Sequence, residues 1–151
     1  MVVRDGSTHY MFAEGPRPSE SQLLTSPDGV KWTVVGVLDI RTTAGRPIER
    51  PFGTPTVWLE DGRWYLFYER ADLGVWLATT HDPRSLRWTN VQDEPVLEPG
   101  PAEYDREMIA VDQIIQHRGV YYAFYHASGR CAEGATRTWN TNIARSTDLR
   151  H

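Results

Sequence analysis

The sequence predicts an all-β fold made of about three consecutive propeller blades, each a four-stranded antiparallel sheet. Three segments share one pattern: a β-branched run, a turn that contains glycine, and an aromatic run. The turn glycines Gly6, Gly62 and Gly119 are spaced 56 and 57 residues apart. Because a repeat of this length has room for four strands, the spacing indicates a blade architecture.

The first hairpin of each repeat is predicted by its turn. Asp-Gly and Arg-Gly pairs between strand-like runs favour tight hairpins, because these turns need a positive φ. The strands that follow are rich in aromatic residues, as in residues 64–68 (WYLFY) and 121–125 (YYAFY). Such strands suit sheets that are buried on both faces.

A second hairpin follows in each repeat. The turn at residues 26–29 (SPDG) precedes Trp32, and the turn at residues 81–83 (HDP) precedes Trp88, which lies 56 residues after Trp32. The third repeat has residues 147–149 (TDL) at the corresponding place. We therefore expect blades at about residues 1–36, 54–92 and 111–151, within one domain that spans 1–151.

One segment has an alternative interpretation. Met108, Ile109, Val111 and Ile115 have the spacing of an amphipathic helix, whereas the repeat alignment favours a strand from about Val111. The stretch from 126 to 141 is the longest insertion within a blade, and long loops on rigid scaffolds often carry function.

Composition excludes several classes of partner and site. The net charge is −4 and no basic run stands out, so we expect no nucleic-acid partner. No apolar stretch reaches the ~20 residues of a membrane span. The single cysteine, Cys131, excludes an internal disulfide and a cysteine-rich metal site. No metal-ligand spacing is present, and we expect no metal site in this chain and no cofactor.

Three blades do not close a ring. An open propeller exposes strand edges, and the third repeat stops before the position of its tryptophan. We expect that the chain is part of a larger propeller. The alternative is that several chains assemble head to tail into a closed ring.

Taken together, these motifs resemble the five-bladed propeller glycoside hydrolases, chiefly family 43 with relatives in families 32, 62 and 117. The aromatic strands are similar to that superfamily's inner hairpins. Residues 144–149 (ARSTDL) are similar to its outer-strand Ser-x-Asp-Leu signature. Residues 110–112 (AVD), just upstream of Gly119, are similar to its third-blade aspartate motif.

The resemblance implies a carboxylate mechanism in which blades one, three and four supply acids to a central site. It implies that Asp112 is the third-blade carboxylate, which holds substrate and raises the pKa of the general acid. Pro55 stands at the corresponding place in the second repeat. The general base and the general acid are expected outside these residues. Asp105, in the connection before the third blade, is expected to matter much less.

The resemblance also implies a carbohydrate substrate and a rim of charged residues that binds it. Candidate substrate-binding residues stand where the second strand of each hairpin returns to the site, or in loops beside it: Glu14, Arg50, Glu69, Arg70, His126 and Trp139. In some relatives an ion lies on the propeller axis, so a structural axial ion is compatible with the full-length protein. His9, His81 and His117 are expected at exposed outer turns.

Two other functions stay open. Residues 26–32 (SPDGVKW) resemble the Asp-box of sialidase-type propellers, although here Asp28 and Gly29 are adjacent. A non-catalytic carbohydrate-binding or scaffold propeller is the alternative from another class. The sequence leaves the compartment open, and a secreted or periplasmic location would suit a bacterial enzyme that acts on polysaccharides.

Overall fold

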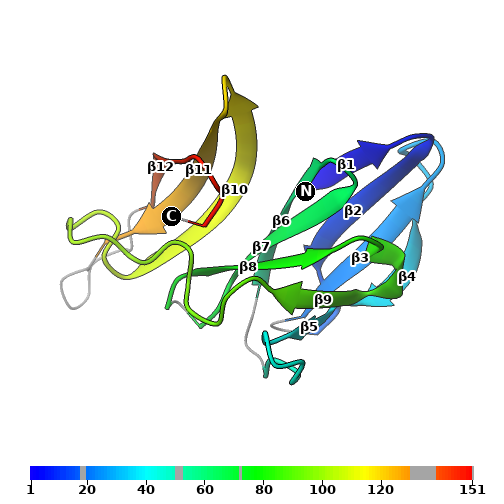
Figure 1. Cartoon of the computed structure of the whole chain (residues 1–151), viewed down its shortest axis with the longest axis horizontal. Helices are drawn as coiled ribbons and strands as arrows, with labels where there is room; N and C mark the ends of the chain where they lie inside the picture. The colour runs from blue at the N-terminus through cyan, green and yellow to red at the C-terminus, as the bar shows by residue number, and fades with distance from the viewer. Residues whose placement is uncertain (18–19, 50–52, 72, 130–138, 151) are drawn as a thin grey trace.

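The computed structural model describes residues 1–17, 20–49, 53–71, 73–129 and 139–150, which form three sheets side by side (Figure 1). The first sheet contains β1 (Val2–Asp5), β2 (Thr8–Glu14), β3 (Ser21–Ser26) and β4 (Thr33–Val37). The second contains β5 (Asp39–Arg41), β6 (Gly53–Glu60), β7 (Arg63–Glu69), β8 (Val75–Thr80) and β9 (Arg87–Asn90). The third contains β10 (Met108–His117), β11 (Val120–Ser128) and β12 (Trp139–Ser146). A 3₁₀ turn, η1 (Pro83–Ser85), precedes β9.

The all-β prediction is confirmed, and β10 shows that the helix alternative for residues 108–115 is wrong. Successive strands pair antiparallel within each sheet, in the orders β1-β2-β3-β4, β6-β7-β8-β9 and β10-β11-β12. The first sheet has the four strands expected. The second has a fifth, because β5 from the connection after the first sheet pairs in parallel with β9.

The inner hairpin turns differ by one position from the predicted equivalence. The two-residue loops are Gly6-Ser7, Asp61-Gly62 and Arg118-Gly119. Gly6 is therefore the first loop residue, whereas Gly62 and Gly119 are the second. In the latter two loops both residues have positive φ, as a type I′ turn requires.

The outer turns repeat one hydrogen-bond pattern. The Ser26 hydroxyl lies 3.0 Å from Asp28 Oδ1, and that carboxylate accepts from two backbone N–H groups downstream. Ser146 and Asp148 are arranged in a similar way: the hydroxyl lies 3.0 Å from the carboxylate, which accepts from the Arg150 N–H. The Ser-x-Asp signature is thus a turn motif, in which short polar side chains satisfy backbone groups.

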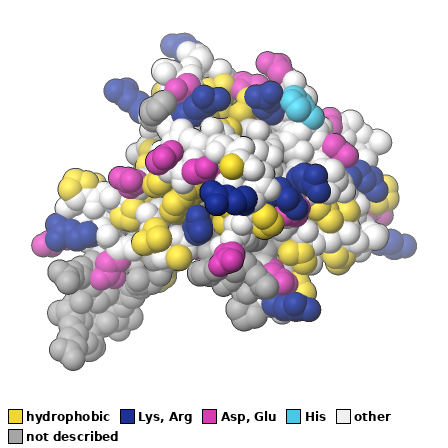
Figure 2. Space-filling model, turned by 60° about the horizontal axis from the view of Figure 1, so that its bottom comes forward, with side chains coloured by type: hydrophobic (Ala, Val, Ile, Leu, Met, Phe, Trp, Pro, Cys, Tyr) yellow, Lys and Arg dark blue, Asp and Glu magenta, His cyan; other side chains and the backbone are white. Residues whose placement is uncertain are grey.

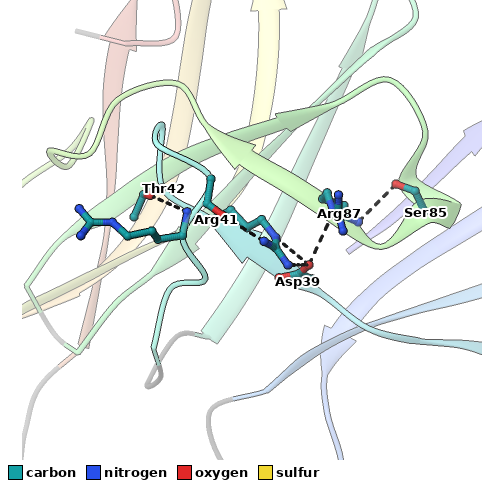
Figure 3. A network of polar contacts seen from close by, with 7 residues as sticks. Asp39, Arg41, Thr42, Ser85 and Arg87 are labelled. Carbon is teal, nitrogen blue, oxygen red and sulfur yellow. Dashed lines mark hydrogen bonds and ion pairs between the residues drawn. The ribbon is translucent and has the colours of Figure 1, made fainter.

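Strand β5 pairs with β9 at the edge of the second sheet, and charged side chains of the two strands lie together there (Figure 3). Asp39 Oδ2 lies 2.8 Å from a guanidinium nitrogen of Arg41 and 3.8 Å from that of Arg87. Beside this network, Ile40 pairs with Trp88, which is fully buried. Trp32 precedes β4 at the corresponding place and is only half-buried.

Two hydrophobic cores lie between the sheets, and β7 contributes to both. Trp64, Leu66 and Tyr68 face the core shared with the first sheet, whereas Phe67 faces the core shared with the third. In the first core, Phe12 and Trp88 meet edge to face with ring centroids 5.8 Å apart. The aromatic strand is therefore buried on both faces, as the sequence predicted.

The surface is mixed in character. On the face shown in Figure 2, acidic and basic side chains are interspersed. Among the described residues, no helix is long and apolar enough to cross a membrane. His81 and His117 are exposed as expected, but His9 is half-buried, because its ring packs close to Gly29 of the neighbouring outer turn.

Candidate active site

Two inner strands bulge at corresponding positions. In the third sheet Val111 pairs with Tyr125 and Gln113 with Phe124, so Asp112 is an extra residue without a partner on β11. In the second sheet the register shifts between Gly53 and Thr56, which places Pro55 in the corresponding bulge. Bulges redirect side chains and are frequent beside active sites.

The ends of the second strands supply the next group of side chains. Glu14, Glu69 and His126 each lie seven residues after the second residue of their hairpin loop. They are therefore structurally equivalent, as the sequence predicted for the returning strands. Since the repeat places them at the same end of each sheet, they form one rim with the two bulges.

Glu14, from the first sheet, lies beside residues of the second and third sheets. It lines the same surface hollow as Pro55 and Asp112. A Cβ atom on Gly53 would lie 3.7 Å from Glu14 Oε1 and 4.0 Å from Glu69 Oε2. Carboxylates from the first and the second sheet therefore both lie near Gly53. Gly53 was not among the residues predicted for the site, although a glycine inside a strand is a known signal of close approach.

Asp112 contacts one other predicted site residue, His126, which in turn contacts a second, Trp139. Its Oδ1 lies 2.8 Å from His126 Nδ1, and the ring centroids of His126 and Trp139 are 5.5 Å apart with an interplanar angle of 65°. The Asp112 side chain is 47% exposed, so its carboxylate remains accessible to a ligand. Asp112, His126 and Trp139 thus form one cluster, which we call the rim cluster.

Thr56 ties the second sheet to the bulge of the third. Its buried hydroxyl donates to the carbonyl oxygen of Val111 at 2.7 Å and lies 3.3 Å from that of Asp112. This contact joins residues that are 55 positions apart in the sequence. No feature of the sequence marks Thr56 as a member of the site.

Two predicted substrate-binding residues, Arg70 and Arg50, are not part of the rim cluster. The Arg70 guanidinium carbon stands 5.7 Å from the centre of the Trp76 ring, a cation–π contact on the side of the second sheet. A role of Arg70 in substrate binding stays a prediction. Arg50 lies outside the described residues.

Asp105 is more embedded than the sequence suggested. It is buried, with Oδ2 3.4 Å from the Tyr125 hydroxyl, and its carboxyl group lies against Gly100. Burial, followed by the negative charge of Asp105, raises the pKa of Tyr125. Asp105 is therefore a buried residue of the connection, and substituting it would be expected to disturb the packing around Tyr125.

Within the described parts of the chain, no three His, Cys, Asp or Glu side chains gather in a way that could hold a metal ion. The expectation that this chain needs no cofactor stays a prediction. The chemistry available on the rim is that of carboxylates, an imidazole and an indole, which suits the recognition of neutral hydroxyl-rich molecules.

Comparisons with solved structures identify the fold. A thermostable family-43 glycoside hydrolase matches with a TM-score of 0.71 at 18% identity, covering 99% of this chain and 48% of that chain. A family 117 glycoside hydrolase from the marine bacterium Zobellia galactanivorans matches with a TM-score of 0.72 at 22% identity, covering 97% and 51%. A family 32 β-fructofuranosidase of Bombyx mori gives 0.68 at 14%, covering 97% and 32%.

This chain has the fold of the five-bladed propeller glycoside hydrolases. The predicted partial propeller fold is thereby confirmed. The chain spans about half the length of the first structures it matches. No family model matches the sequence, and a search of curated proteins finds no match. The likeness is thus one of fold.

Proposed function

We propose that this chain is part of a glycoside hydrolase that acts on oligo- or polysaccharides, in which Asp112 contacts the sugar. The observation that carries the proposal is the bulge of β10, which places an accessible carboxylate beside the hollow shared with Glu14. The structural neighbours add support, since they include glycoside hydrolases of families 43, 117 and 32.

The proposed chemistry needs a protonated carboxyl group and an ionised one on opposite sides of the glycosidic bond. In our proposal these two groups come from blades outside the 151 residues, since the chain covers about half of its structural neighbours. Asp112 is the third carboxylate. Its negative charge favours the protonated form of the general acid, and its oxygen accepts a hydrogen bond from a sugar hydroxyl.

The test is Asp112→Asn in the full-length protein. This substitution keeps the shape and removes the charge, so we expect kcat to fall about 100-fold or more. The alkaline limb of the pH profile should move to lower pH, because the general acid loses a proton more readily without the nearby charge. Asp61→Asn is the matched control, since Asp61 is exposed in a hairpin turn where Asn also tolerates positive φ.

Near-full kcat with an unmoved alkaline limb in Asp112→Asn would contradict the proposal. We also expect the 151-residue chain alone to hydrolyse no aryl glycoside. Turnover by this chain that Asp112→Asn abolishes would mean that the site is complete within it and that the other blades are unnecessary.

The second candidate is a propeller that binds carbohydrate without cleaving it. Trp139 favours this candidate, because an exposed indole at the rim can stack on a sugar ring. Calorimetric binding of an oligosaccharide by the full-length protein, with no turnover over a panel of aryl glycosides, would support it over the hydrolase.

A further inference from the structure

Because of the bulge, Asp112 has no paired residue on the neighbouring strand β11. Val111 and Ile114 both face the core between the second and third sheets, although regular alternation would place them on opposite faces. The extra residue of the bulge shifts the alternation by one, so that Val111 and Ile114 share one face. Asp112 and Gln113, which lie between them, are exposed. The Asp112 carboxylate therefore lies at the surface, where a side-chain contact can fix its position.

His126 provides the contact. In the described part of the chain, the only hydrogen bond of the Asp112 carboxylate is the 2.8 Å bond with His126 Nδ1. A carboxylate only accepts, so the proton of this bond belongs to Nδ1. In a neutral imidazole Nε2 is then the unprotonated nitrogen.

The His126 ring is itself well held. Its residue pairs with Ala110 on one side and Thr141 on the other, so its backbone lies in the middle strand of the third sheet. The Trp139 ring packs against the imidazole at a steep angle, and the imidazole side chain is only 30% exposed. Because the His126 imidazole is held in this way, it can hold the Asp112 carboxylate in one position.

We propose that His126 is a positioning residue for Asp112. Its Nδ1–H bond occupies Oδ1 and directs Oδ2 toward the hollow, where it meets the sugar hydroxyl. This inference rests on the proposed function, because it assigns the device that orients the carboxylate used there. Placement of a reacting group within a fraction of an ångström governs turnover, and a shift of about 1 Å can cost about 100-fold.

The first arm of the test does not depend on activity. Long-range ¹H–¹⁵N NMR spectra of the 151-residue chain report which ring nitrogen of each histidine carries the proton. We expect the Nδ1–H form for His126 and a change toward the Nε2–H form in Asp112→Ala. His117, exposed at the end of β10 beside the inner hairpin turn, is the internal control and should not change. An Nε2–H form in the unsubstituted chain, or no change in Asp112→Ala, would overturn the pairing.

The second arm uses the full-length protein. Asn places a donor near the position of Nδ1, whereas Gln places it near Nε2. We expect His126→Ala and His126→Gln to lower kcat about 10- to 100-fold with little change in KM, and His126→Asn to stay within about 3-fold. If kcat were unchanged from the unsubstituted protein in all three variants, or fell by the same factor in all three, the positioning role would be wrong.

The two proposals fail differently. If the full-length protein cleaves no glycoside, the proposed hydrolase is wrong, and the same variants are compared by oligosaccharide affinity. Affinity that falls in His126→Ala and His126→Gln and is retained in His126→Asn supports positioning in a binding site. Affinity that does not follow this order rejects it.

Discussion

Thr56→Val tests the link between the second and third sheets. The Thr56 hydroxyl is buried and donates to the Val111 carbonyl at 2.7 Å, and Val111 is itself only 2% exposed. Valine keeps the β-branched shape and the strand preference, so the change removes only the donor. A buried carbonyl that loses its donor costs about 1–3 kcal/mol of unfolding free energy.

For a chain of this size, about 1–3 kcal/mol corresponds to a fall in Tm of roughly 2–12 °C. Urea unfolding followed by tryptophan fluorescence measures the loss as a lower midpoint at an unchanged slope. The matched control is Thr89→Val on β9, where the side chain is exposed and the change should stay within about 0.5 kcal/mol. If both variants unfold at the same urea concentration, the hydroxyl bond contributes nothing and the reasoning fails.

Three further predictions concern stability. Hydrogen bonds, the one from the Lys31 N–H first, lower the pKa of Asp28. Stability should therefore fall as the pH drops below about 4, and less so in Asp28→Asn, as acid titration by circular dichroism would report. Burial raises the pKa of Tyr68 to about 12. The unfolded chain loses this proton first, so stability should fall between pH 10 and about 12, and a Tyr68→Phe variant with the same alkaline slope would disprove this. Gly100→Ala should cost about 1–3 kcal/mol in urea unfolding, because its Cβ would lie 2.3 Å from the buried Asp105 carboxyl; an unchanged midpoint would show that Asp105 can move away.

The equivalence of the rim residues followed from the sequence. Glu14, Glu69 and His126 could be chosen because each follows an aromatic run at a similar distance from a hairpin turn. Turns and strands are encoded locally, by glycine at positive φ and by apolar periodicity, so a repeat of them predicts which residues share one end of the sheets. Asp112 was identified in the same way, through its distance from the turn at Gly119.

The contacts between these residues could not be predicted from the sequence, because they form only in the folded chain. The bulge that frees Asp112, the bond to His126 and the approach of Glu14 to Gly53 all depend on strand register and on how the sheets pack. The hydroxyl bond of Thr56 joins two sheets across 55 residues of sequence. Such contacts arise from packing between elements distant in the chain, and neither turn chemistry nor local periodicity carries that information.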